Sequence, residues 1–299
     1  MSSAAAPIPG AVTKERKRSY WHDVFKRFSR HKLAMAGLAV IALELVLVLA
    51  LPLALHLDPY SMNTDSGFGA PPIAAHPLGT DEVGRDVFAR IVYGGRTSLF
   101  VGLVSALVSL AIGVPLGLLA GYYKGVPGVM VMRLADIFMS VPSMILVLVL
   151  VSMIGPSIQS VTIVIGVMGW PQFARQLYGS VLAVREKDYV QAAVAIGEKS
   201  WRIILKYILP NAFAPVIITF TFSIASAILQ ESSLSFLGMG VQLPQASWGN
   251  IMYAAQSITV LSQRPWLWVP PGLALLITVL SINFFGDGLR DALDPKTKL

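Results

Sequence analysis

One short segment gathers the side chains best suited to chemistry. Imidazole and carboxylate groups that could together bind a divalent cation follow one another closely at His76, Asp81, Glu82 and Asp86. Consecutive carboxylates on a helix do not point at one ion, so we interpret this cluster as helix-capping and solvated groups. The segment therefore predicts no metal site.

Four other carboxylates lie within or at the ends of long apolar runs, at Glu44, Asp136, Glu231 and Asp287. A carboxylate at membrane depth is a candidate functional group, because leaving its charge unpaired there is costly. For Glu44 we expect protonation or a hydrogen bond between helices instead, and we expect Asp136 to be solvated near the inner boundary. The sequence assigns no solute-binding residue, and the roles of Glu44 and Glu231 stay open.

Nucleotide hydrolysis by this chain alone is excluded by the motifs it lacks. No Gly-x-x-x-x-Gly-Lys-[Ser/Thr] run occurs, and the dipeptide Gly-Lys is absent. A phosphate-binding loop needs that lysine and the flanking backbone. The chain also contains no cysteine, which excludes disulfides, thiolate chemistry and cysteine-bound metal. We predict a protein that is not an enzyme and holds no cofactor.

Composition indicates an integral membrane protein. Hydrophobic residues make up 55% of the 299 residues and charged residues only 13%, about half the charged share of an ordinary soluble domain. A helix needs about 20 apolar residues to cross the hydrocarbon layer. Six segments qualify, and they are 33–55, 98–123, 136–154, 157–174, 212–229 and 267–285. The predicted fold is an all-α, polytopic bundle of six transmembrane helices.

The basic residues predict the orientation of the bundle. Eight of the 23 Lys and Arg residues lie in a basic arm at 1–32, directly before the first span. With both termini cytoplasmic, 19 of these residues lie inside and 4 outside, as the positive-inside rule requires. We therefore interpret the arm as a topology signal, with no role in nucleic-acid binding. The apolar run after it is too long for a cleavable signal peptide.

The predicted outer loop, 56–96, contains an amphipathic pattern. Thr80 or Asp81 can cap a helix whose apolar residues recur at helical spacing, and Gly94 and Gly95 can end it. We expect a helix lying on the outer membrane surface or against the bundle.

A separate pattern lies within the second span. Its glycines at 113, 117 and 121 share one helix face, where small residues allow another helix to approach closely. This pattern predicts helix packing and carries no functional content.

The largest inner loop, 175–210, is predicted to be ordered. Asp188 and Gln191 form a plausible capping pair for a helix that ends at Gly197 in the left-handed conformation. Ser200 can cap a second helix, and Pro210 breaks the chain as it re-enters the membrane. An ordered loop with exposed aromatic residues is suited to docking another protein.

These residues resemble the EAA loop of binding-protein-dependent ABC-transporter permeases. The matching positions are Gln191-Ala192-Ala193, Gly197 and Leu209-Pro210. Three further stretches resemble the C-type subunit of oligopeptide and dipeptide permeases, at 76–88, 231–250 and 286–295. The resemblance covers nearly the whole chain after about residue 20, and it implies the transmembrane domain of a type I ABC importer.

The resemblance also implies a working assembly. Two homologous permeases form the path, two cytoplasmic ATPases hold ATP and Mg²⁺, and an extracytoplasmic binding protein delivers the solute. The inner loop then seats in the ATPase, with coupling positions at Asp188, Gln191, Ala192, Ala193, Gly197, Leu209 and Pro210. Gln191 stands where the family motif usually has Glu, which puts in doubt any role of that carboxylate as a charged partner for the ATPase.

The implied organisation divides the chain into five parts. These are a cytoplasmic arm at 1–32, a first span at 33–55, an extracytoplasmic loop at 56–96, a permease core at 97–289 and a cytoplasmic tail at 290–299. The implied location is the bacterial cytoplasmic membrane, with bound lipid. The substrate stays open between dipeptide, oligopeptide, glutathione and chelated nickel. A proton-coupled secondary transporter and a purely structural membrane subunit are the alternatives in function.

Overall fold

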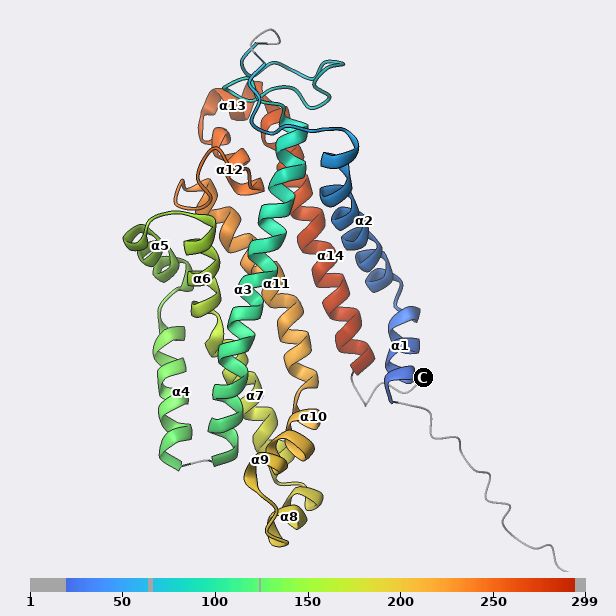
Figure 1. The fold of residues 1–299 in the computed structure, drawn as a ribbon, viewed down its shortest axis with the longest axis vertical. Helices are drawn as coiled ribbons and strands as arrows, with labels where there is room; N and C mark the ends of the chain where they lie inside the picture. Colours follow the sequence, from blue (N-terminus) through green and yellow to red (C-terminus); the bar gives the residue numbers. More distant parts are fainter. Residues whose placement is uncertain (1–19, 64–66, 124, 294–299) are drawn as a thin grey trace, which may run out of the picture.

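The computed structural model describes residues 20–63, 67–123 and 125–293, which form an elongated bundle of helices (Figure 1). No β-strand occurs in these three ranges, although a few isolated β-bridges close the long loop after α2. Most of the predicted basic arm and most of the predicted tail lie outside the described residues. The all-α prediction is confirmed.

Four helices are long and apolar enough to cross a membrane. They are α2 (Lys32–Ala54), α3 (Val87–Tyr123), α11 (Ala214–Phe236) and α14 (Val269–Leu293), the last extended by a 3₁₀ turn, η3 (Pro265–Leu267). They correspond to the first, second, fifth and sixth predicted spans. Along each of them the run of apolar residues satisfies the length that a bilayer requires.

The third predicted span, 136–154, is not one straight helix. α4 (Gly125–Ser140) and α5 (Ser143–Ile154) meet at an angle of 86°. Pro142 lies at the break, where it lacks an N–H and disfavours helical geometry at the residue before it. The prediction of an unbroken helix here is wrong.

The fourth predicted span, 157–174, is also divided. α6 (Ile158–Met168) and α7 (Trp170–Arg185) join at Gly169, and Pro171 lies in the first turn of α7. The described residues thus contain four helices that could each span a membrane, or five if the bent pair α4–α5 counts as one span.

α3 packs along α7 through the predicted glycine face. A Cβ at Gly113 would lie 2.6 Å from the carbonyl oxygen of Trp170, and a Cβ at Gly117 would lie 2.6 Å from that of Ala174. Gly121 meets Val181 one turn further on. No side chain larger than hydrogen fits between these backbones, so the prediction of close packing is confirmed.

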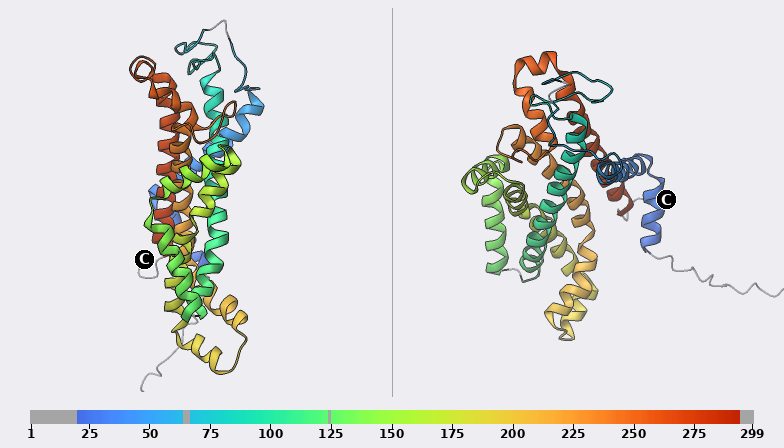
Figure 2. Two further views of the ribbon diagram at one scale, coloured as in Figure 1. Left: turned by 90° about the vertical axis from the view of Figure 1, so that its left-hand side faces the viewer. Right: turned by 45° about the horizontal axis from the view of Figure 1, so that its top comes forward.

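The two ends of the bundle differ. One end carries the loop after α2, together with α12 (Trp248–Met252), the 3₁₀ turn η2 (Tyr253–Gln256) and α13 (Ile258–Gln263). The other end carries α8 (Asp188–Ala195), and α1 (Tyr20–Arg30) and the end of α14 lie on this side of the bundle (Figures 1 and 2). The first and last described residues therefore share the side of α8.

The predicted surface helix after Thr80 is wrong. The chain is irregular up to Asp86, whose Oδ1 accepts the backbone N–H of Ala89 and so caps α3. Gly94 and Gly95 lie within α3 and do not end it. A Cβ at Gly94 would lie 3.1 Å from the backbone at Ser247, and a Cβ at Gly95 would lie 2.7 Å from the side chain of Val48, so small residues suit both positions. The amphipathic pattern is therefore the first part of a longer buried helix.

Candidate functional site

The segment after α7 forms a hairpin that projects from the end of the bundle (Figure 1). α8 ends at Ala195, and Gly197, two residues further on, has φ +76°. The N–H of Glu198 donates to the carbonyl of Ala193 at 3.1 Å, and the N–H of Gly197 donates to that of Val194 at 3.0 Å. These two bonds form a Schellman motif, so the predicted left-handed stop is confirmed.

One face of α8 anchors the hairpin to the bundle. Val190 and Ala193 are buried in a cluster with Leu177 and Val181 of α7 and with Ile203 beyond the turn. α8 is therefore held against α7 by apolar burial, which stabilises a segment too short to be helical on its own.

The other face of the hairpin is exposed and unusually apolar. Ile196 is 81% exposed, Trp201 57% and Val194 50%. Asp188, Gln191, Ala192 and Gly197 are exposed as well. A projecting, ordered, apolar tip of this kind is typical of a surface that another protein covers.

The predicted coupling residues divide into two groups. Asp188, Gln191, Ala192 and Gly197 are exposed on the hairpin, whereas Ala193 points into the anchoring cluster. Leu209 and Pro210 belong to α10 (Leu209–Ala212), at the junction with the bundle. Four of the seven residues are therefore exposed on the hairpin, Ala193 anchors it, and Leu209 and the exposed Pro210 lie where it joins the bundle.

The predicted capping pair is wrong. The N-cap of α8 is Lys187, and Asp188 is its first helical residue, with no cap made by a side chain. The amide nitrogen of Gln191 instead donates to the carbonyl of Arg185 at 2.9 Å, which ties α8 to the end of α7. The acceptor is a carbonyl oxygen, so the bond needs a side chain that donates a hydrogen. An amide has N–H groups to donate, whereas an ionised carboxylate has none.

The second helix of the loop also differs from its prediction. α9 (Ser200–Arg202) has Lys199 as its N-cap, and it continues into a π-helix, η1 (Ile203–Ile208), in which the N–H of Leu209 bonds the carbonyl of Ile204. Pro210 lies in α10, and a single non-helical residue, Phe213, separates α10 from α11. A π-turn widens the helix just before the proline, where a tighter helix would meet the pyrrolidine ring.

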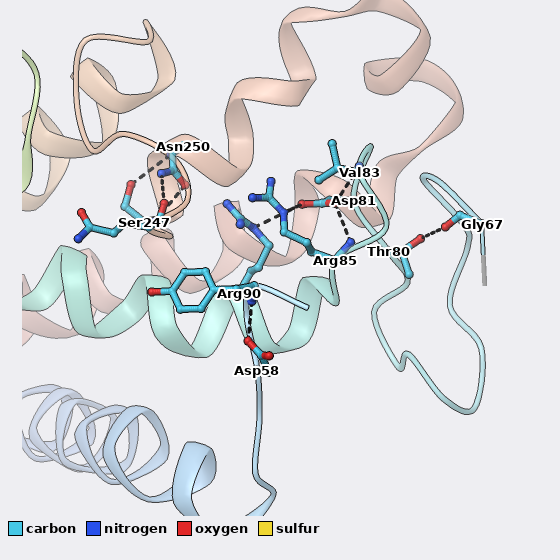
Figure 3. A network of polar contacts seen from close by, with 11 residues as sticks. Asp58, Gly67, Thr80, Asp81, Val83, Arg85, Arg90, Ser247 and Asn250 are labelled. Carbon is cyan, nitrogen blue, oxygen red and sulfur yellow. Dashed lines mark hydrogen bonds and ion pairs between the residues drawn. The ribbon is translucent and has the colours of Figure 1, made fainter. Parts of the chain in front are cut away.

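A polar cluster occupies the opposite end of the bundle. Arg85 Nε donates to Asp81 Oδ2 at 2.7 Å, and Arg90 Nε lies 3.5 Å from the same oxygen (Figure 3). His76 Nδ1 and Asp86 Oδ2 are 2.6 Å apart in a separate pair. Asp86 caps α3, as the capping interpretation expects, but Asp81 and Asp86 are ion-paired with arginine and histidine and are not simply solvated. No group of three potential metal ligands occurs in the described ranges.

A second buried cluster centres on Glu231 of α11. The carboxylate is fully buried and accepts hydrogen bonds from Ser98 of α3 at 2.9 Å and from Ser235 at 2.7 Å. Ser98 accepts the backbone N–H of Trp248, and Ser235 accepts that of Val241. Sequence reasoning missed this network, although the serine at i+4 from Glu231 was a visible signal.

Glu44 makes one hydrogen bond between helices. Thr278 of α14 donates through Oγ1 to Glu44 Oε2 at 2.9 Å. This contact agrees with the predicted bond between helices and gives Glu44 a packing role.

Asp136 forms ion pairs with Arg175 of α7 and, at 3.8 Å, with Arg133 of its own helix. Its side chain is 47% exposed. The predicted solvation is accompanied by pairing with two arginines.

Comparison with known protein families identifies two matching regions. Residues 113–299 match the model of the binding-protein-dependent transport system inner membrane component. Residues 19–72 match the N-terminal TM domain of oligopeptide transport permease C. The two regions together cover most of the chain.

Individual relatives match along nearly their whole length. The chain is 40% identical over 280 residues to the dipeptide transport system permease protein DppC of Alkalihalophilus pseudofirmus, covering 94% of this chain and 91% of that protein. It is 38% identical over 301 residues to the oligopeptide transport system permease protein OppC of Bacillus subtilis, covering 100% and 97%. Among solved structures, an inward-facing conformation of the MetNI methionine ABC transporter aligns with a TM-score of 0.57 at 21% identity, covering 69% of this chain and 97% of that chain.

Proposed function

Because the chain belongs to the family of binding-protein-dependent transport system inner membrane components, we propose that it is a permease subunit of an ATP-driven importer for dipeptides or oligopeptides. The match to relatives named for dipeptide and oligopeptide transport over more than nine-tenths of the chain carries this proposal. The chain is a multi-pass membrane protein and not an enzyme.

Transport by such a subunit needs partners. The family implies an ATPase and a binding protein, and we propose the full set as one homologous permease, two ATPases and one extracytoplasmic binding protein. ATP and Mg²⁺ would bind the ATPases, since this sequence has no phosphate-binding loop. We assign the hairpin of α8 to the cytoplasmic side, with both termini on that side and the α12–α13 end outside, in the bacterial inner membrane.

The hairpin is the proposed coupling site. Its exposed Ile196, Trp201 and Val194 supply apolar area for the ATPase, and its buried Val190 and Ala193 hold it rigidly to α7. The hairpin must be rigid, because a movement of the ATPase has to displace the helices of the bundle and must not be absorbed by bending of the loop. Alternating access then follows as the two coupling sites move with the ATPases.

The proton-coupled alternative has less support. Glu44 accepts a hydrogen bond from Thr278, and Asp136 is ion-paired with two arginines. Both carboxylates are therefore engaged with other side chains, which does not favour a role as a proton carrier. The purely structural alternative does not account for the exposed apolar hairpin.

Reconstituted uptake tests the proposal. The assembly of both permeases, both ATPases and the binding protein is placed in proteoliposomes, and accumulation of a radiolabelled dipeptide is measured. We expect uptake only with hydrolysable ATP, and no effect of a protonophore. Uptake that a protonophore abolishes while ATP is present, or uptake without nucleotide, would overturn the proposal.

A further inference from the structure

α7 has two chemically different faces. Phe173, Ala174, Leu177 and Val181 are buried against α3 and the hairpin cluster. The opposite face is exposed and consists of Gln172, Arg175, Gln176, Gly179 and Ala183, whose spacings of three and four residues form one stripe. No large apolar side chain lies on this stripe.

The neighbouring helix α4 shows the reverse pattern. Its exposed positions include Val126 at 71%, Met130 at 66% and Ile137 at 64%. Such a face is suited to lipid or to another apolar helix. The bundle therefore presents the polar stripe of α7 beside the apolar face of α4. Residues on both faces are exposed, so the two faces differ in chemical character and not in exposure.

The first part of the polar stripe lies beside the apolar run of α3. Ala174 packs on Gly117, inside the apolar run of α3, and Arg175 is the next residue. Charged and amide side chains at the depth of such a run normally face water or a polar partner, since contact with lipid tails leaves them unsatisfied.

An ion-paired group marks the middle of the stripe. Arg175 pairs with Asp136 of α4, and Arg133 lies 3.8 Å from the same carboxylate. The exposed fractions of the side chains of Arg133, Asp136 and Arg175 are 78%, 47% and 49%. Two guanidinium groups thus share one carboxylate, which leaves one positive charge and several N–H donors facing outward.

Two cavities follow the stripe. One of about 450 Å³ is lined by Gln172, by Gln230 of α11 and by the bend between α4 and α5. The other, of about 490 Å³, is lined by Gln172, Arg175, Gln176 and Gly179. Gln172 borders both cavities, so the two hollows adjoin along α7.

We propose that the polar face of α7 is the wall of the solute path, and that the guanidinium groups of Arg175 and Arg133, which share Asp136, bind the carboxylate of the passing peptide. This inference rests on the proposed function for the nature of the solute. Arg suits the task because its planar fork donates two parallel hydrogen bonds to a carboxylate. A peptide that brings its own carboxylate can replace Asp136 at either guanidinium.

The absence of cysteine from the chain makes a labelling test direct. Single-cysteine variants Gln172→Cys and Gln176→Cys on the stripe are compared with Ile137→Cys and Met130→Cys, which are exposed apolar positions on α4 away from its end. The assembled transporter in nanodiscs is treated with a negatively charged, membrane-impermeant thiosulfonate, and the label on this chain is measured by mass spectrometry. No ATP or solute is needed, so the result does not depend on whether the assembly transports peptides.

We expect the two stripe variants to react at least about tenfold faster than the α4 variants, because the reactive thiolate forms in water and not in lipid. Comparable rates on both helices would show that α7 faces lipid or a partner helix and would overturn the assignment of the path.

The charge of the site is tested with the same variants. Near Arg175 the anionic reagent should react several-fold faster with Gln176→Cys than a cationic one of equal size, as attraction by one net positive charge predicts. Adding Arg175→Gln should remove that preference while leaving labelling by a neutral reagent unchanged.

Ligand recognition is tested by protection of Gln176→Cys. Dialanine should slow labelling by a neutral reagent, whereas dialanine amide, which has no carboxylate, should not. If both compounds slow labelling equally, or if neither slows it, the assignment of a carboxylate-binding site is overturned. This holds even if the first experiment shows that the stripe faces water.

Discussion

Replacing Gly197 tests the coupling hairpin most directly. Gly197 has φ +76°, and a Cβ there would meet nothing within 4 Å. The cost of a side chain is therefore purely one of backbone conformation. A non-glycine residue in this region costs about 1–2 kcal/mol, and a β-branched residue costs more, up to about 3 kcal/mol.

A variant with Gly197→Val should escape this strain by leaving the left-handed conformation. It would then lose the two backbone hydrogen bonds that Glu198 and Gly197 donate to α8. A penalty of about 1.4 kcal/mol lowers the population of the native turn tenfold relative to its alternatives. Because the turn lies outside the anchoring cluster, membrane insertion should be unaffected.

The assay measures dipeptide uptake and ATP hydrolysis together in proteoliposomes containing the full assembly. We expect Gly197→Val to reduce uptake at least about fivefold per ATP hydrolysed, and Gly197→Asn to stay near wild type, because Asn tolerates the left-handed region. Gly125→Val is the matched control, since Gly125 has φ +63°, also has open space around it, and is the first residue of α4. If Gly197→Val transports as well as wild type, or if Gly125→Val fails equally, the reasoning about the hairpin is refuted.

Three further predictions concern packing and buried polar groups. Glu231→Leu should lower the melting temperature in detergent clearly more than Glu231→Gln, because it leaves the Ser98 and Ser235 hydroxyls without an acceptor at about 1–3 kcal/mol each, and equal melting temperatures would contradict this. Gly117→Val should abolish recovery of folded protein, since its Cβ would lie 2.6 Å from the carbonyl oxygen of Ala174, whereas Gly125→Ala, at an open position, should be recovered normally in the same size-exclusion assay. Glu44→Gln should retain ATP-driven uptake, because an amide oxygen can still accept the bond from Thr278, and a loss of uptake would revive the proton-relay alternative.

The sequence predicts those features that depend on composition and on single residues with a strong conformational preference. The apolar runs at α2, α3, α11 and α14 are visible because a bilayer demands length and hydrophobicity together. Gly197 and the glycine face of α3 are predicted for the same kind of reason, since few other residues satisfy a positive φ or a close helix contact.

The errors occur where tertiary contacts override a local pattern. Gly94 and Gly95 are ordinary helix-ending signals, but here they let α3 pass the backbone at Ser247 and the side chain of Val48. Asp188 and Gln191 have capping spacing, yet Gln191 bonds Arg185 because α8 folds back on α7. Pro142 is a local signal for a break in the third predicted span, but the 86° angle depends on the packing of α5 against α6, which no local signal reports.

α7 connects the two proposed sites in one element. Leu177 and Val181 on its buried face share a cluster with Val190 and Ala193 of α8, and Gln191 bonds the last turn of α7. A close-packed contact of this kind transmits displacement, because separating the helices would open a void at a cost that grows with its volume. A displacement of the hairpin is therefore transmitted to α7, which carries the polar stripe on its opposite face. On the proposed function, the charged group at Arg175 changes position whenever the ATPases open or close, so release of the solute carboxylate and resetting of the hairpin are one motion and not two.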